Sequence, residues 1–337
     1  MSVIKKLQEL SFIWSTEDPF LFCAHHQDDY PEGNADQGPS RQALGGRNLG
    51  QDFEPSSSFR MYHGHQVPGF PEHPHRGFET ITIALEGMVD HFDSMGASGR
   101  YGGGDIQWMT AGKGMQHCEM FPLVHEDKAN PLHLFQIWMN LPAKDKFVEP
   151  EYKMIWHENL WKISEDISGE VELRVIAGKY KSGTVLAPVS NSWASKAENN
   201  VNIWLIEMAE GAKFVLPNSS STVNRNLYVY EGSQMIFADE PVEVPRQVSL
   251  MNEEITIINQ GKKASMLLLE GEPIGEVVEK YGPFVMNTKE EIKQAYEDYQ
   301  QTQFGGWPWS RPDQVHERNQ QRMAKYVDGS LVYPPSV

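Results

Sequence analysis

Residues 73–83 read HPHRGFETITI and place two imidazoles at alternate positions ahead of a β-branched run. Such a run favours a strand, and alternate residues of a strand point to the same face, so His73 and His75 share one. A later segment, GKGMQHCEM at residues 112–120, places His117 and Glu119 two positions apart in the same way. The two pairs are therefore candidates to converge on one ion.

Three neutral imidazoles and one carboxylate are a ligand set for a divalent transition metal. The set suits Fe(II), Mn(II), Ni(II), Cu(II) or Zn(II), and it is too rich in nitrogen for Ca(II) or Mg(II). On a six-coordinate ion, four protein ligands leave two positions for water, O2 or substrate. On a tetrahedral Zn(II) the same set is closed and structural. Cys118 lies between two ligands and is expected to point the opposite way.

Glu79 has the same parity as His73 and His75 and is a further candidate at this site. It can be a fifth ligand, an acceptor that orients an imidazole N–H, or a general base beside the open positions. The alternative is a structural salt bridge to Arg76 or Arg60 on the barrel wall.

Two other histidine pairs compete with this assignment. His63 and His65 have the same spacing, but Pro and Gly follow them at once and break the strand, and no partner pair of similar spacing is left. His25 and His26 are adjacent, so on a strand they point to opposite faces and favour packing over metal binding.

Short apolar segments separated by turn residues fill the regions 81–138 and 171–269, which predicts antiparallel β-structure in both. Between Glu158 and Gln314 there is no histidine, so an imidazole-based metal site is excluded from the second half. We therefore predict a metal-binding barrel with an N-terminal arm in residues 1–145. Residues 146–337 are predicted to form a second, metal-free barrel with a C-terminal helix and tail.

The helix is predicted from a capping box at Thr288 and Glu291, followed by apolar residues at helical spacing. The segment FGGWPW at residues 304–309 cannot extend this helix, and we expect it to lie along the surface with its tryptophans as anchors.

Composition narrows the function classes. At 337 residues, two domains are expected, and a formal net charge of −17 disfavours direct nucleic-acid binding. The sequence has no long apolar run and no signal-peptide pattern at its start, so we expect a soluble cytoplasmic protein without membrane attachment. We also expect a monomer. Its two cysteines form no CxxC pair, which excludes a zinc ribbon or a disulfide scaffold.

Several sequence blocks together resemble the pirin family of the cupin superfamily. They are HPHRGFETIT, LEGMVDHFDSMG, GGGDIQWMTAGKGMQHCEMFP, FQIWMNLP, GEPIGE and YGPFVMNT. The resemblance implies two all-β cupin barrels, which are double-stranded β-helices of jelly-roll type, with a metal in the N-terminal barrel alone. Carried over by motif, the ligands are His73, His75, His117 and Glu119, with Glu79 outside the ligand set. Fe(II) is the metal we expect.

The resemblance also implies two classes of function. Some pirins act as quercetin 2,3-dioxygenases, in which a metal and O2 act on a flavonol or similar aromatic. Others are iron-dependent, redox-sensing regulators that bind a protein partner without turnover. A third interpretation is a structural protein with a vestigial site. The long arm and tail are more typical of the longer bacterial members than of the compact mammalian pattern.

Overall fold

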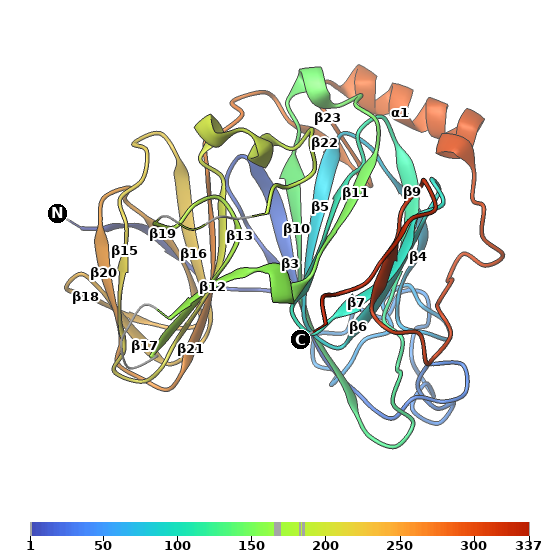
Figure 1. Ribbon diagram of the computed structural model, residues 1–337, viewed down its shortest axis with the longest axis horizontal. Coiled ribbons are helices and arrows are strands. Elements are labelled where there is room, and N and C mark those ends of the chain that lie inside the picture. Colours follow the sequence, from blue (N-terminus) through green and yellow to red (C-terminus); the bar gives the residue numbers. More distant parts are fainter. Residues whose placement is uncertain (1, 165–169, 182, 184–185, 337) are drawn as a thin grey trace. The chain divides into compact units, whose positions relative to one another are not determined.

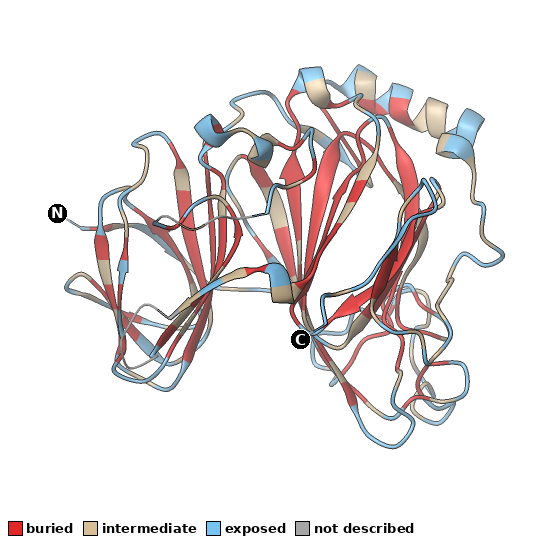
Figure 2. Ribbon diagram, in the orientation of Figure 1, coloured by how far each residue is buried: buried red, intermediate tan, exposed pale blue. Residues whose placement is uncertain are grey.

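The structure is a computed structural model that describes residues 2–164, 170–181, 183 and 186–336 (Figure 1). Its regular structure is mainly antiparallel β, and Figure 2 shows strands that are buried over much of their length. The chain divides into two compact units. We call residues 24–158 with 276–337 the first barrel, and residues 1–23 with 159–275 the second barrel. Within the described ranges, no helix is both long and apolar enough to cross a membrane.

The first barrel is built from two antiparallel sheets. One contains the consecutive strands β11-β8-β5-β10-β3, and the other has the order β25-β24-β7-β6-β9-β4. The strands of the first sheet are Glu151–Ile155 (β11), Asp105–Thr110 (β8), Phe78–Glu86 (β5), Asn130–Asn140 (β10) and Phe20–Tyr30 (β3). Those of the second sheet are Leu331–Val332 (β25), Met323–Lys325 (β24), Ser98–Gly102 (β7), Met88–Asp93 (β6), Met115–Met120 (β9) and Gly69–His75 (β4).

The second barrel also has two antiparallel sheets, with the orders β1-β19-β16-β21-β14-β13-β12 and β15-β20-β17-β18. The strands of the larger sheet are Ile4–Gln8 (β1), Arg246–Leu250 (β19), Asn224–Glu231 (β16), Ala264–Gly271 (β21), Asn202–Met208 (β14), Val171–Ala177 (β13) and Trp161–Ser164 (β12). Those of the smaller sheet are Lys213–Leu216 (β15), Ile255–Asn259 (β20), Gln234–Phe237 (β17) and Glu240–Glu243 (β18). The remaining short strand of this unit is Ile13–Trp14 (β2).

The two barrels repeat one strand order. The series β8-β5-β10-β3 matches β19-β16-β21-β14, and β7-β6-β9-β4 matches β18-β17-β20-β15. Strands β4, β5, β9 and β10 of the first barrel therefore correspond to β15, β16, β20 and β21 of the second. The prediction of two all-β barrels is confirmed.

The predicted C-terminal helix is α1, Lys289–Thr302, and it begins with both hydrogen bonds of the predicted capping box. Its buried Ile292 and Ala295 pack against Phe284 of the hairpin that precedes it. That hairpin consists of Glu279–Tyr281 (β22) and Phe284–Met286 (β23). The short 3-10 helices are Ala143–Asp145 (η1), His157–Asn159 (η2), Trp193–Ser195 (η3), Ala197–Asn199 (η4) and Gln303–Gly305 (η5).

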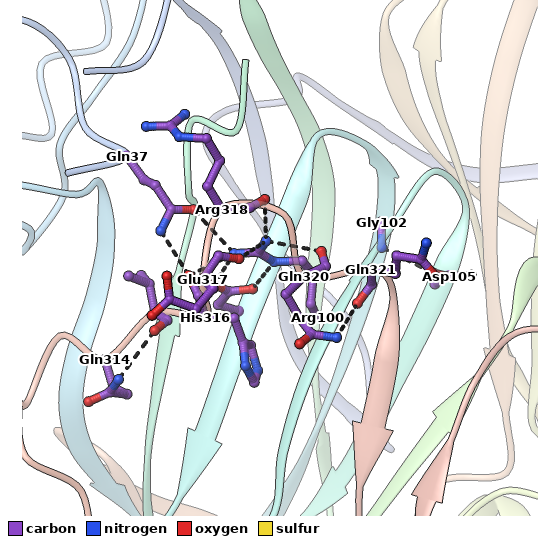
Figure 3. Close-up of polar contacts among 12 residues, drawn as sticks. Gln37, Arg100, Gly102, Asp105, Gln314, His316, Glu317, Arg318, Gln320 and Gln321 are labelled. Carbon is purple, nitrogen blue, oxygen red and sulfur yellow. Dashed lines mark hydrogen bonds and ion pairs between the residues drawn. The ribbon is translucent and has the colours of Figure 1, made fainter. Parts of the chain in front are cut away.

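The tail beyond α1 is held by the buried Arg100 of β7 (Figure 3). The guanidinium forms two 2.7 Å bonds to the Asp90 carboxylate. Its Nη1 also donates to the carbonyl oxygens of Glu317, Arg318 and Gln320 at 2.9, 3.1 and 3.2 Å. β24 then pairs antiparallel with β7. The tail is therefore part of the barrel wall.

The tryptophans of the tail act as the predicted anchors. Trp307 and Trp309 pack against buried residues that include Phe92 and Cys118. Trp309 Nε1 also donates to the carbonyl oxygen of Asp93 at 2.8 Å.

The two compact units differ from the predicted division at residue 145. Of the N-terminal arm, residues 1–23 belong with the second barrel, where β1 pairs with β19, and the remainder belongs with the first barrel, as do the helix and tail. Both assignments depend on pairings between segments far apart in the sequence, such as Ile4 with Leu250. Local sequence patterns do not encode such pairings.

Candidate metal centre

Strands β4 and β9 bring three predicted ligands together. His73 lies directly opposite His117 in their antiparallel register. The ring centroids of His73 and His117 are 4.5 Å apart, and those of His75 and His117 are 4.9 Å apart. One ring nitrogen of each imidazole lies within 4.8 Å of the other two.

Two of the three rings are oriented by hydrogen bonds as neutral ligands. His73 Nδ1 lies 2.8 Å from the carbonyl oxygen of Pro71, and His75 Nδ1 lies 3.4 Å from that of Pro283. A nitrogen bound to a carbonyl oxygen must donate, so the Nδ1 atoms carry the hydrogen and each Nε2 keeps a lone pair for a metal. Neither nitrogen of the fully buried His117 has a hydrogen-bond partner among the described residues.

Burial keeps these imidazoles uncharged. It lowers the pKa of His73 to about 4. Burial, followed by the neighbouring imidazoles, holds the pKa values of His75 and His117 well below their ordinary value. Neutral imidazole is the form that binds a metal.

Glu119 lies beside this cluster, with its Oε2 3.9 Å from His117 Nε2. Thr82 Oγ1 donates to Glu119 Oε1 at 3.1 Å, and Gln136 Nε2 donates to Oε2. Burial raises the pKa of Glu119, and the nearby His91 opposes that rise. A cation at the three imidazoles would stabilise the ionised carboxylate.

The residues fit a divalent transition metal. A fully buried imidazole with two unpartnered nitrogens is costly unless another group binds it. Three nitrogen donors and an adjacent carboxylate are the chemistry that such an ion requires.

Comparison with known proteins agrees with the fold. Residues 14–139 match the Pirin family model, and residues 203–305 match that of the Pirin C-terminal cupin domain. The chain belongs to the pirin family. A Pseudomonas aeruginosa protein named "putative quercetin 2,3-dioxygenase" is 36% identical over 237 residues, which cover 69% of this chain and 79% of the relative.

Two further comparisons place this pirin-family chain among its relatives. Human pirin is 34% identical over 271 residues, which cover 79% of this chain and 87% of the relative. A crystal structure of quercetin 2,3-dioxygenase from Acinetobacter baumannii matches with a TM-score of 0.69 at 27% identity. That match covers 90% of this chain and 96% of the other. The two barrels are therefore cupin barrels, as the resemblance implied.

His91 is a buried residue near the cluster that the sequence patterns did not single out. It lies opposite Glu119 in the register of β6 and β9, and its ring centroid is 5.5 Å from that of His117. His91 Nε2 lies 3.1 Å from Asp93 Oδ2. The signal was present as a histidine two positions before an aspartate in the segment LEGMVDHFD.

Glu79 lies on the face of β5 that points away from the cluster. Thr82 faces the barrel interior, because it donates to Glu119. Glu79 is three positions earlier, so its side chain points the opposite way, where it accepts a 2.7 Å hydrogen bond from Thr110 Oγ1. The predicted shared face with the histidines is therefore wrong.

The prediction for Glu79 fails at the turn between β4 and β5. β4 ends at His75 and β5 begins at Phe78. Gly77 between them has a positive φ of 85°, so the alternation of one strand does not continue into the next. Arg76 and Arg60, the alternative partners considered for Glu79, form ion pairs with Asp298 and Asp28.

The competing histidine pairs lie outside the cluster. His63 and His65 are exposed, and His63 Nδ1 lies 2.7 Å from the carbonyl oxygen of Gly50. His26 is buried with its ring edge-on to Tyr62, and His25 Nε2 lies 2.9 Å from His133 Nε2.

A second group with metal-ligand chemistry, Asp105, His157 and Glu158, already binds a cation of the chain itself. Arg322 Nη1 donates to Asp105 at 2.8 Å, and its Nη2 pairs with Glu158.

Proposed function

We propose that this pirin-family chain is a metal-dependent oxygenase of the quercetin 2,3-dioxygenase type, acting with O2 on a flavonol or a similar aromatic. The observation that carries the proposal is the convergence of three neutral imidazoles beside the Glu119 carboxylate. The names of the Pseudomonas and Acinetobacter relatives support the same reaction class.

In this proposal His73, His75, His117 and Glu119 hold the ion, with Fe(II) as the expected metal. When bound, such an ion supplies a Lewis acid for an oxygen of the substrate and a redox centre for O2. Glu79 has no part in the reaction, because it faces away from the ligands.

The surrounding residues orient the ligands and exclude water. The carbonyl oxygens of Pro71 and Pro283 fix the rings of His73 and His75. Phe78 and Trp138 stack with their centroids 4.0 Å apart, and Trp138 lies 5.2 Å from the His75 ring. These two rings form an aromatic wall beside the ligands, which suits a planar aromatic substrate.

A second candidate is an iron-dependent, redox-sensing regulator that binds a protein partner without turnover. The burial of the ligands favours it, since His75 is 4% exposed and His117 is 0% exposed. A site this enclosed can hold an ion without admitting a flavonol.

Anaerobic reconstitution separates the two candidates. Protein loaded with Fe(II), Mn(II), Ni(II) or Cu(II) is given quercetin and O2, and quercetin loss is measured together with carbon monoxide release. The oxygenase proposal expects both signals with at least one metal. Full metal occupancy without turnover would exclude quercetin dioxygenation and leave the regulator, which expects partner binding to differ between Fe(II) and Fe(III).

A further inference from the structure

A cavity of about 580 Å3 opens at one end of the second barrel. Its volume lies within the range of roughly 300–1,000 Å3 that is typical of small-molecule sites. The side chains that carry the argument are Lys179, Lys196, Asn202, Ser219, Arg225 and Glu270.

The cavity occupies the end of the second barrel that corresponds to the metal centre of the first. The connection from β4 to β5 follows His75 in the first barrel. The corresponding connection, from β15 to β16, supplies Pro217 and Ser219 to the cavity lining, and Arg225 follows at the start of β16. Because this barrel contains no histidine, its lining calls for a different ligand chemistry.

The floor of the cavity is a buried ion pair between Arg225 and Glu270, both at most 2% exposed. Glu270 Oε1 also accepts hydrogen bonds from Asn202 Nδ2 and Ser219 Oγ, each at 2.7 Å. Three donors thus satisfy the carboxylate, and its charge is balanced. Because the ion pair already has its partners, these side chains do not have to be ordered when a ligand binds.

The guanidinium of Arg225 also donates hydrogen bonds to two backbone carbonyl oxygens. Its Nη2 donates to the carbonyl oxygen of Pro217 at 2.8 Å, and its Nη1 donates to that of Glu253 at 3.2 Å. With the bond to Glu270, these contacts use three of the five N–H groups that an arginine carries.

The lining has a surplus of positive charge. Besides Arg225 it contains Lys179 and Lys196, which form no ion pair within the described part of the chain, whereas its described carboxylate is Glu270. Glu272 accepts a hydrogen bond from Asn200 and is not part of the lining. In a chain with a formal net charge of −17, such a cavity attracts small anions.

We propose that this cavity binds a small organic anion through Lys179 and Lys196, above the floor formed by the Arg225–Glu270 ion pair. A carboxylate and a phosphate share this chemistry. Ser220 and Asn218 of the lining add neutral hydrogen-bonding groups, and Trp204 adds an aromatic surface. The site is independent of the metal centre and of the oxygenase proposal.

Isothermal titration calorimetry on the full chain tests the site, with inorganic phosphate and succinate as separate probes. The variant K179Q/K196Q is expected to weaken binding of the preferred probe by about tenfold or more, because two charge-assisted contacts are lost. K213Q/K262Q is the matched control. It makes the same charge change with two exposed lysines that do not line the cavity. Lys213 is the first residue of β15, and Lys262 lies in the turn between β20 and β21. This control variant should bind the probe as the parent protein does.

The probe that binds more tightly, phosphate or succinate, identifies the anionic group that the cavity prefers. Binding that is equal in both double variants, or that is lost only in His117→Ala, would place the anion elsewhere and overturn the proposal. The absence of heat with either probe at 10 mM would overturn it as well. Both lysine pairs are partly or fully exposed, so the variants are expected to fold, and a thermal unfolding curve verifies this.

Discussion

His73 and His117 lie directly opposite each other across β4 and β9, with ring centroids 4.5 Å apart. The antiparallel register thus joins two locally spaced pairs into one cluster. Each of the three rings contacts the other two, and His117 is distinguished because neither of its nitrogens is hydrogen-bonded to a described residue. Its substitution should therefore affect the metal more than any packing contact.

We predict that His117→Ala reduces the metal content of the purified protein to background. The change removes a buried nitrogen donor that no other described side chain replaces at that position. His65→Ala is the matched control, because His65 is exposed and lies outside the cluster, and its metal content should equal that of the parent protein. Elemental analysis of protein reconstituted under identical conditions measures both. Full metal occupancy in His117→Ala would remove this residue from the ligand set.

The sequence predicted those parts of the structure that depend on local patterns. The capping box at Thr288 predicted where α1 begins, and the spacing of His73 and His75 predicted two rings on one side of β4. Alternation failed for Glu79 because the turn at Gly77 separates two strands. The prediction treated residues 73–83 as one strand, and no hydrophobic pattern marks that turn.

Features that depend on distant pairing were not accessible from the sequence. Pro283, whose carbonyl oxygen faces His75, comes from the hairpin before α1, which was assigned to the other domain. His91 is placed beside Glu119 by the register of β6 with β9. Neither relationship has a signal within one window of sequence, because each depends on which strands are neighbours.

The hydrogen bond from Gln136 to Glu119 should control metal affinity. Gln136→Leu removes a donor to the buried carboxylate, so the carboxylate loses its orientation and is more easily protonated. We expect metal affinity to fall by roughly 10–100-fold, the usual effect of losing a group that orients a ligand. Competition with a chelator of known affinity measures the change.

Thr110→Val provides the control for Gln136→Leu. It removes the hydrogen bond to Glu79 on the opposite face of β5, so metal affinity should stay unchanged even if stability falls. A loss of affinity as large as that of Gln136→Leu would mean that Glu79 acts on the metal after all.

Arg100 should determine whether the tail stays attached to the first barrel. Arg100→Met leaves Asp90 as a buried charge without its guanidinium partner and frees the carbonyl oxygens of Glu317, Arg318 and Gln320. Breaking such a buried pair typically costs about 3–5 kcal/mol. We expect a loss of this size in urea unfolding, together with faster tryptic cleavage at Arg318 and Arg322.

Arg311→Met is the corresponding control within the tail. Arg311 is exposed and its partner Asp313 is partly exposed, and such surface pairs contribute about 0–1 kcal/mol. Its unfolding curve should therefore match that of the parent protein. Equal stability of the Arg100 and Arg311 variants would show that the contacts of Arg100 do not hold the tail.

Lys146 should make stability depend on pH in the alkaline range. The side chain is 1% exposed, and its Nζ donates to the carbonyl oxygen of Gly77 and to Asn140 Oδ1, each at 2.8 Å. A third bond, of 3.2 Å, reaches the carbonyl oxygen of Val285 in β23. Burial lowers the pKa of Lys146 from 10.5 to about 8, because the neutral acceptors compensate only in part for lost hydration.

The direction of the pH effect follows from this lowered pKa. Between about pH 8 and pH 10.5 the unfolded chain binds the Lys146 proton more tightly than the folded chain, so this residue makes stability increase as pH rises. Below pH 8 the full cost of burying the charge is present, roughly 3 kcal/mol at about 1.4 kcal/mol for each pKa unit.

Lys146→Met abolishes this titration. The difference in unfolding free energy, parent minus variant, should therefore rise by up to about 3 kcal/mol across that window. Lys144→Met, an exposed change in the same turn, should keep the pH profile of the parent protein. If the Lys146 and Lys144 variants gave parallel profiles, Lys146 would not be a buried charge in the folded protein.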